Sequence, residues 1–257
     1  MNVSGLLGFL AAVALIVWGM VAKGDPLSIF VDYQSLAIVF GGTFGALFMA
    51  FPFKVIKNVP KMIWMTIRPK KYNPQYYIDQ MVEYAKIARS KSLLALEDSA
   101  NDCKDPFMKS SLMLIVDAND SDRVKSMLDD AIDFMCERHE ENVSIFDKGS
   151  ALSPAFGMIG TLLGLIIMLK NLSQDQSKLG EGMSVALITT FYGSIFSNLI
   201  CAPISTRLKA IHKEEVLCMQ IVEEGALAII SGANPRYIKE KLEFMLPKSS
   251  TKGNEEK

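Results

Sequence analysis

The chain has 257 residues, with 27 basic and 28 acidic side chains, yet its mean hydropathy is +0.23. Such a charge content and such a hydropathy fit together only if charged and apolar residues occupy separate stretches of the chain. This composition excludes an ordinary soluble globule and a disordered chain, and the long uncharged stretches exclude a porin-like barrel.

Four windows of the sequence contain no Asp, Glu, Lys or Arg: residues 1–22, 33–53, 149–169 and 182–206. Each window is as long as the roughly 20 apolar residues that a helix needs to cross a bilayer. The first window has no basic residue at its start and exceeds the roughly 7–15 apolar residues of a signal peptide, so we expect it to remain as a span. The windows therefore predict four transmembrane helices.

These windows divide the chain into four parts. We expect transmembrane helices 1 and 2 with a short periplasmic loop in 1–53, a cytoplasmic helical domain in 54–148, transmembrane helices 3 and 4 in 149–206, and cytoplasmic C-terminal helices with a tail in 207–257. Lys and Arg cluster after the second and fourth windows, and such short basic flanks stay in the cytoplasm. We therefore predict a multi-pass membrane protein with both termini in the cytoplasm.

The charged part of the chain shows helical rather than strand periodicity. Apolar residues recur near helical spacing in 74–88 and in a longer stripe from 124 to 146 that continues into the third window. The fourth window continues as a helix to about residue 222, and Asn234 and Pro235 then precede a last short helix in 237–246. The fold class is an all-α integral membrane protein with a large cytoplasmic helical domain.

None of the four windows carries an Asp, Glu, His, Lys or Arg, although ion-transport proteins place such residues inside the bilayer. If ions cross near this protein, the essential carboxylate must come from another chain. Small and hydroxyl-bearing residues share a face of the third window and a face of the fourth, and this pattern permits close helix packing. They are Gly157, Gly160, Thr161 and Gly164, and Ala186, Thr190, Gly193, Ser194 and Ser197.

The sequence has no recognisable catalytic or metal-binding motif. It contains no HExxH, GxSxG or phosphate-binding loop, and its four cysteines show no CxxC spacing. His139 and His212 lie in charged helical stretches, where we interpret them as solvated surface residues. We therefore expect no enzyme activity, catalytic residue, cofactor, permanent metal or nucleic-acid partner.

Four segments together resemble the MotA/PomA family, the larger stator subunit of the bacterial flagellar motor. They are AKIARSKSLLALED (85–98), SPAFGMIGTLLG (153–164), VALITTFYGSIFSNLICAP (185–203) and EGALAIISGANPRYIKEKLEFML (224–246). Their order and the span topology match the family over essentially the whole chain. An ExbB/TolQ-type energiser of the outer membrane is the alternative, but such proteins usually have three spans.

The resemblance implies a homopentamer in the inner membrane around two copies of a single-span MotB/PomB-type subunit that carries a membrane aspartate. Ion flow past that aspartate would turn the pentamer against the rotor protein FliG. Pro154 and Pro203 match prolines that couple ion movement to conformational change.

Arg89 and Glu97 match the charged pair that faces the rotor, and Lys91 and Asp98 lie beside them. Ser90 departs from the family, in which a second basic residue often follows the arginine. If this stretch is one continuous helix, neither Arg89 nor Glu97 has an opposite charge three or four residues away. We therefore expect both charges to be available to another molecule.

The resemblance also concerns the transported ion. Thr161 and Thr189 match positions at which sodium-type members have threonine, whereas Thr190 occurs in both sodium- and proton-type members. Hard cations prefer oxygen ligands, so we favour Na⁺ over H⁺. Threonine also serves as a packing residue in membrane helices, so the proton alternative stays open.

Overall fold

The computed structural model describes residues 3–22, 24, 26–117, 120–171 and 177–246. Every regular element within these ranges is helical, so the predicted all-α class is confirmed. The expected polar tail, 248–257, lies outside the described residues. The chain forms two compact units, which we call the first unit (1–70 and 140–210) and the second unit (71–139 and 211–257).

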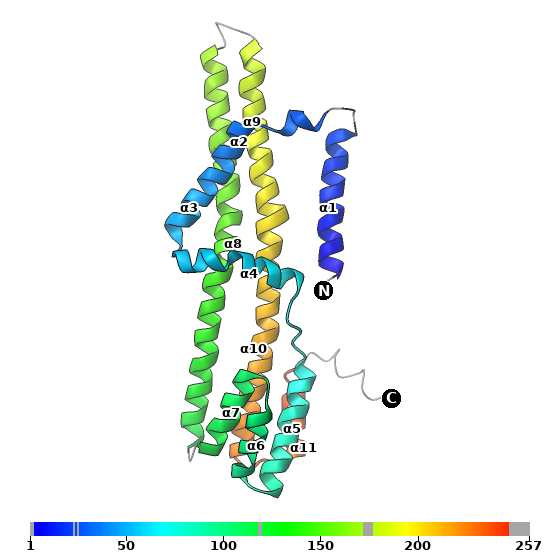
Figure 1. The fold of residues 1–257 in the computed structure, drawn as a ribbon, viewed down its shortest axis with the longest axis vertical. Helices are drawn as coiled ribbons and strands as arrows, with labels where there is room; N and C mark the ends of the chain where they lie inside the picture. The colour runs from blue at the N-terminus through cyan, green and yellow to red at the C-terminus, as the bar shows by residue number, and fades with distance from the viewer. Residues whose placement is uncertain (1–2, 23, 25, 118–119, 172–176, 247–257) are drawn as a thin grey trace. The chain divides into compact units, whose positions relative to one another are not determined.

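The first unit is built from apolar helices (Figure 1). Its elements are α1 (Val3–Val21), η1 (Leu27–Phe30), α2 (Tyr33–Leu36), the π-helical η2 (Ala37–Gly41), α3 (Gly42–Ala50), α4 (Phe53–Ile67), α8 (Ser121–Asn171) from residue 140 onward, α9 (Ser177–Ile195), the π-helical η4 (Phe196–Cys201) and the start of α10 (Ala202–Ile230). The predicted stripe that runs into the third window is confirmed, because α8 continues without a break through that window.

Three segments of the described chain are long and apolar enough to cross a membrane: Leu27–Ala50, a part of Ser121–Asn171 and a part of Leu179–Ile230. They contain most of the second window and all of the third and fourth. The first window forms α1, of which Leu7–Val21 is an apolar helix shorter than a full span.

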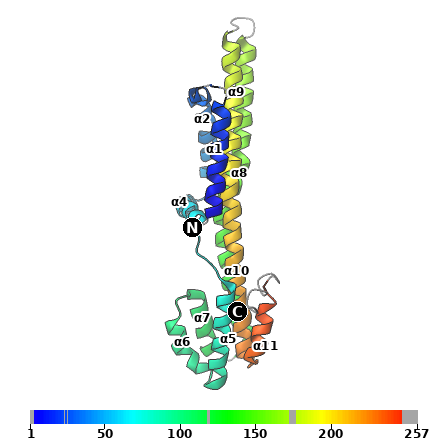
Figure 2. The same ribbon diagram turned by 90° about the vertical axis from the view of Figure 1, so that its right-hand side faces the viewer.

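Within the first unit, α8 and α9 run side by side in both ribbon views (Figures 1 and 2). Tyr192 of α9 ties the second span to this pair, because its hydroxyl donates to the Phe30 carbonyl and accepts from the Asp32 N–H at 3.2 Å. Aromatic rings of both spans pack around this link: Phe30, Phe40, Phe44, Phe191 and Phe196.

The second unit has a conventional apolar core. It contains α5 (Pro74–Ser90), η3 (Leu93–Ala95), α6 (Leu96–Asp102), α7 (Pro106–Asp117) and α11 (Pro235–Glu243), together with the adjoining ends of α8 and α10. Ile78, Met81, Leu112 and Ile221 are fully buried in its core. The predicted break after the fourth helix is confirmed: α10 ends at Ile230, Gly232 adopts a φ of +71°, which favours glycine, and Asn234 caps α11.

The stretch from Arg89 to Glu97 is not one continuous helix. Helix α5 ends at Ser90, the chain turns, and α6 begins at Leu96. Leu96 and Ala100 are fully buried in the core of the second unit, and the turn lets α6 present them to that core. Offsets counted along one helix therefore do not describe the surroundings of these charges.

Candidate functional site

The α8 and α9 backbones approach each other at glycines. A Cβ atom built on Gly164 would lie 2.4 Å from the Gly182 carbonyl oxygen, and one built on Gly193 would lie 2.5 Å from the Ser153 carbonyl oxygen. No side chain fits at such distances, so glycine is required for this approach. The predicted role of the glycines in close helix packing is confirmed.

Two threonine hydroxyls meet across this interface. Thr161 Oγ1 lies 2.5 Å from Thr190 Oγ1 and 3.0 Å from the Ala186 carbonyl oxygen, and Thr190 Oγ1 lies 3.2 Å from the same carbonyl. Each hydroxyl has one hydrogen to donate and two lone pairs that can accept. One hydroxyl can donate to the other and the second to a carbonyl oxygen, which leaves at least one lone pair available on each oxygen. Thr190 is exposed on the surface of the single chain.

Thr189 does not take part in this hydroxyl pair. Its side chain is fully buried, its hydroxyl donates to carbonyl oxygens of its own helix, Val185 at 2.9 Å or Ala186 at 3.0 Å, and its methyl group fills the space beside Gly160. The structure therefore brings Thr161 together with Thr190, and it places Thr189 in the packed interface behind them.

Further hydroxyls continue the interface along the two helices. Ser153 Oγ donates to the Gly193 carbonyl at 3.2 Å, and Ser197 Oγ donates to the Ser150 carbonyl at 2.7 Å. Pro154 lies inside α8 next to Ser153, and a Cβ built on Gly193 would lie 3.2 Å from the Pro154 Cα. Pro203 is the second residue of α10, directly after the π-helical η4. Both prolines thus flank this row of hydrogen bonds.

An ion pair lies at the end of this row of hydrogen bonds. Lys209 Nζ lies 2.7 Å from Asp147 Oδ2, and Ser205 Oγ donates to Asp147 Oδ1 at 2.6 Å. Partial burial raises the pKa of Asp147, but the hydrogen bonds from Lys209 and Ser205 outweigh this effect and hold the pKa below its usual value. The pair therefore joins α8 and α10 as long as Asp147 is ionised.

The four predicted rotor-contact residues lie in the second unit, on the short stretch from the end of α5 to the start of α6. Arg89, Lys91, Glu97 and Asp98 are exposed. Within the described chain their side chains form no ion pair, and Glu97 and Asp98 occupy the first turn of α6, where a helix N-terminus favours acidic groups. The surface thus presents two positive charges and two negative charges in separate places.

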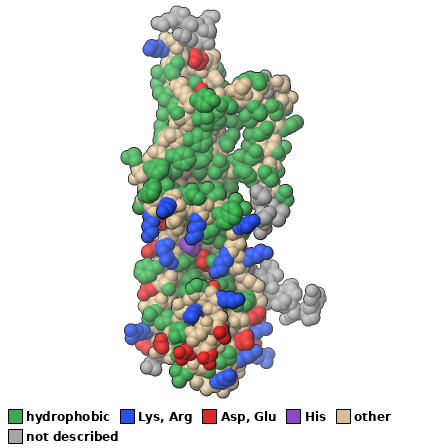
Figure 3. Space-filling view, viewed as in Figure 1, with side chains coloured by type: hydrophobic (Ala, Val, Ile, Leu, Met, Phe, Trp, Pro, Cys, Tyr) green, Lys and Arg blue, Asp and Glu red, His purple; other side chains and the backbone are tan. Residues whose placement is uncertain are grey.

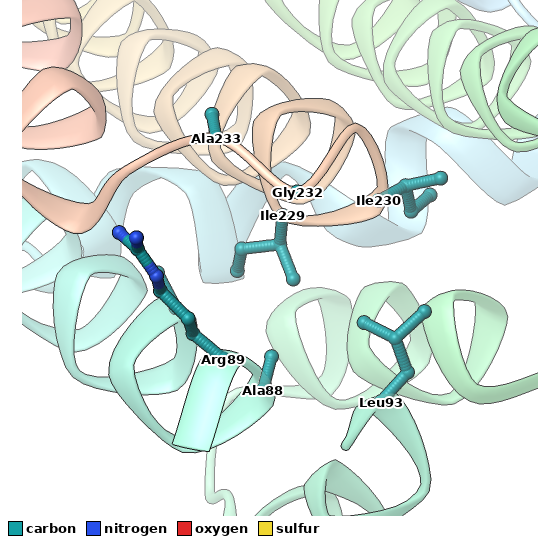
Figure 4. A pocket seen from close by; sticks show the side chains of 8 residues that line it. Ala88, Arg89, Leu93, Ile229, Ile230, Gly232 and Ala233 are labelled. Carbon is teal, nitrogen blue, oxygen red and sulfur yellow. The ribbon is translucent and has the colours of Figure 1, made fainter. Parts of the chain in front are cut away.

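An apolar cavity of about 180 Å³ adjoins Arg89 (Figure 4). Arg89 and Ala88 come from the last turns of α5, Ile229 comes from the last turn of α10, and Gly232 lies in the turn after α10. A cavity of about 150 Å³ is known to hold benzene, so this one is large enough for an apolar side chain. The remaining lining residues are Ala85, Leu93, Ile230 and Ala233.

Sequence reasoning missed the partners of several polar residues. The interpretation of His139 and His212 as solvated is wrong: their Nδ1 atoms lie 3.2 Å apart, and burial lowers the pKa of His139, with His212 adding to this effect and Glu215 opposing it. Ser205 and Lys209, which continue the helix face that contains Ser197, were also missed. A four-residue period that starts at Gly193 and continues past the fourth window could have indicated both residues.

No group of three or more His, Cys, Asp or Glu side chains suited to a metal ion occurs in the part of the chain that the structure describes. The chemistry that the first unit offers is hydrogen bonding by hydroxyls and carbonyls along a tightly packed helix pair.

Comparisons with known proteins add a family match. Residues 6–92 match the family model described as Motility protein A N-terminal, and residues 99–221 match the MotA/TolQ/ExbB proton channel family. The chain is 37% identical over 255 residues to Motility protein A of Borreliella burgdorferi, covering 99% of this chain and 98% of the relative. It is 36% identical over 238 residues to Chemotaxis protein PomA of Vibrio alginolyticus, covering 93% and 92%.

The solved structure of the flagellar MotAB stator complex from Bacillus subtilis contains a similar chain, with a TM-score of 0.85, 29% identity and 97% coverage of both chains. The model matched over 99–221 also covers TolQ and ExbB proteins, whereas the model matched over 6–92 is described for Motility protein A. The N-terminal part therefore favours the flagellar alternative.

Proposed function

The chain belongs to the Motility protein A family, and we propose from this premise that it is a flagellar stator subunit that conducts ions across the bacterial inner membrane together with a MotB/PomB-type subunit. The observation that carries the proposal is the α8–α9 interface, which offers two adjacent hydroxyl oxygens, whereas the four uncharged windows contain no Asp, Glu, His, Lys or Arg. An ion path of this kind is completed by a carboxylate from another chain.

The partner in this proposal is a single-span chain with a membrane aspartate, and the complex contains five copies of this chain around two of the partner. All four apolar windows span the bilayer, with both termini in the cytoplasm. Several large apolar side chains of α8 and α9 are exposed and suit contact with lipid or with neighbouring subunits (Figure 3). They include Met158, Leu162, Ile166, Met183 and Leu187.

We propose Na⁺ as the transported ion, in preference to H⁺. Thr161 and Thr190 supply two adjacent oxygens, Thr190 is an exposed residue, and Na⁺ prefers oxygen ligands as other hard cations do. Thr189 supports this pair by filling the space beside Gly160. The test is the dependence of swimming speed on external Na⁺. Thr190→Ala should raise the Na⁺ concentration for half-maximal speed, whereas Ser194→Ala, which changes a nearby exposed hydroxyl, should not.

The rotor contact in this proposal is formed by Arg89, Lys91, Glu97 and Asp98 with FliG. The absence of ion pairs at these exposed side chains, within the described residues, supports it. Charged rim contacts mainly steer encounter and fix register, so Arg89→Glu should slow rotation more than Arg89→Ala. A matching charge reversal on FliG should restore the speed.

The prolines in this proposal transmit ion movement to the rest of the subunit. Pro154 and Pro203 each remove a backbone donor from a packed helix, and such sites allow a helix to change its bend. Pro154→Ala should leave the amount of assembled complex unchanged and slow rotation.

The decisive experiment is complementation of a strain that lacks its own stator subunits. This chain and its partner should restore ion-driven rotation of tethered cells, and the pair should fail when the partner's membrane aspartate is replaced by asparagine. Rotation without the partner, or substantial ion flux through this chain alone in liposomes, would contradict the proposal.

A further inference from the structure

Pro154 leaves one backbone acceptor of α8 without its usual donor. In an α-helix the N–H of each residue donates to the carbonyl four residues earlier. Proline has no N–H, so the Ser150 carbonyl receives no hydrogen bond from residue 154. Such a carbonyl inside a bilayer needs a donor from another element, because no water is present to satisfy it.

Ser197 of the fourth span supplies that donor. Its Oγ lies 2.7 Å from the Ser150 carbonyl oxygen, and a carbonyl can only accept, so the single hydroxyl hydrogen of Ser197 points to it. The Ser150 Oγ lies 2.9 Å from the Ser197 Oγ and consequently acts as the donor in that second contact. Ser197 is only 4% exposed. The two serines thus form a closed pair of hydrogen bonds between α8 and η4.

Ser197 also belongs to the irregular turn of its own helix. It lies in the π-helical η4 (Phe196–Cys201), and its carbonyl accepts the N–H of Ala202, five residues on. Pro203 follows directly. Single π-turns and proline sites are the places where a helix bends most readily. The Ser197 side chain therefore connects the proline site of α8 to the irregular turn before Pro203.

We propose that Ser197 is a positioning residue that joins these two bending sites, so that a change of bend at Pro154 moves η4 and Pro203 with it. This inference rests on the proposed function, because the movement that it transmits is the one driven by ion passage. It adds to the role of the two prolines a side chain that makes them act together. Separation of the helices at this point would leave the Ser150 carbonyl without a donor, and the two bends therefore change as a unit.

The first test measures rotation of tethered cells that express the full chain with its partner, together with the amount of assembled complex in the membrane. Ser197→Ala should slow rotation by about threefold or more, within the range of couplings between contacting residues, without lowering the amount of complex. Ser197→Thr keeps the hydroxyl and should restore most of the speed. Ser150→Ala is the matched control, because it keeps the carbonyl, and it should have a smaller effect.

The second test is a double-mutant cycle on the thermal stability of the purified complex. In Pro154→Ala the new backbone N–H takes the Ser150 carbonyl, so adding Ser197→Ala should lower the melting temperature less than it does beside Pro154. If Ser197→Ala prevents assembly, Ser197→Cys, which keeps the size and only a weak donor, replaces it in both tests.

The outcomes separate two kinds of failure. Normal rotation of Ser197→Ala, or equal melting shifts in both backgrounds, would overturn the positioning role while the proposed function stands. If the unchanged chain and its partner give no ion-driven rotation at all, the proposed function fails and the positioning role fails with it, even if the melting shifts differ as expected.

Discussion

The α8–α9 interface of the first unit and the apolar core of the second unit bury opposite kinds of groups. Between α8 and α9 of the first unit, glycines and hydroxyls face inward and large apolar side chains such as Leu162 face outward, 57% exposed. In the second unit, large apolar side chains such as Leu112 are inside, and most charged groups lie on the surface. The difference follows from the surroundings that each unit suits. Moving an apolar side chain from water into the protein interior is favourable, whereas moving it there from hydrocarbon gains no hydrophobic free energy.

Two long helices take part in both arrangements. Along α8, the residues up to 139 contribute Val124 and Leu128 to the apolar core of the second unit, and the residues beyond contribute Ser150, Ser153 and Gly157 to the hydroxyl and glycine interface. A single helix therefore changes its packing chemistry along its length. Close approach and hydrogen bonds stabilise one part, and burial of large side chains stabilises the other.

The largest effect is expected from removing close approach in the first unit. Gly164→Val places a side chain where even a Cβ would lie 2.4 Å from the Gly182 carbonyl and 2.8 Å from the Ala186 nitrogen. Because both are backbone atoms, α8 and α9 must separate, and little assembled complex should remain in size-exclusion profiles. Gly180→Ala is the matched control, because no atom lies within 4 Å of a Cβ there. A normal yield of Gly164→Val would show that close approach is dispensable.

The second unit should instead be sensitive to loss of apolar volume. Leu112→Ala removes a fully buried side chain and should lower the free energy of unfolding by about 2–5 kcal/mol. Hydrogen exchange of α5 and α7 amides in the intact chain measures the loss. Leu94→Ala, at a side chain that is 68% exposed, should change protection little. Equal effects of the two variants would contradict the burial argument.

A buried carboxyl makes the second unit dependent on pH. Burial, followed by a hydrogen bond with Asp129, raises the pKa of Glu223 from 4.5 to about 7. The folded state therefore holds a proton that the unfolded chain releases at lower pH, so stability falls as pH rises from about 4.5 to about 7.

Glu223→Gln removes this ionisation and should be more stable than the unchanged chain above about pH 7, by on the order of 2 kcal/mol. Thermal unfolding across the pH range measures the difference. Glu224→Gln, which changes the neighbouring and more exposed carboxyl, serves as the control. The same pH profile for Glu223→Gln and the unchanged chain would assign the dependence to another group.

The smallest effect is expected at the ion pair of the first unit. Lys209 and Asp147 have side chains that are 53% and 47% exposed, so Lys209→Met should lower the free energy of unfolding by only about 0.2–1 kcal/mol. The pKa of Asp147 is depressed in the folded state, so this contribution is present above the unfolded pKa and is lost as pH falls through the folded pKa. In the Asp147→Asn background, Lys209→Met should have no further effect. A large loss of stability from Lys209→Met in that background would indicate another role for the lysine.

The sequence by itself determined the features that depend on neighbouring residues. Uncharged windows located the apolar helices, the helical period of 74–88 predicted α5, and Gly232 with Pro235 marked the end of α10 and the start of α11. The glycine faces also predicted close packing. Each of these signals is contained in one helix or one turn, where local geometry is decided by a few consecutive residues.

Only the tertiary structure decided which residues meet. Thr161 pairs with Thr190, 29 residues away, while the adjacent Thr189 is buried against Gly160. The turn between Ser90 and Leu96 depends on a core built from other helices, and the hydrogen bond from Ser197 to Ser150 joins residues 47 apart. The physical reason is common to all three: the register between two helices is set by contacts along their whole length, and a period within one helix carries no information about that register.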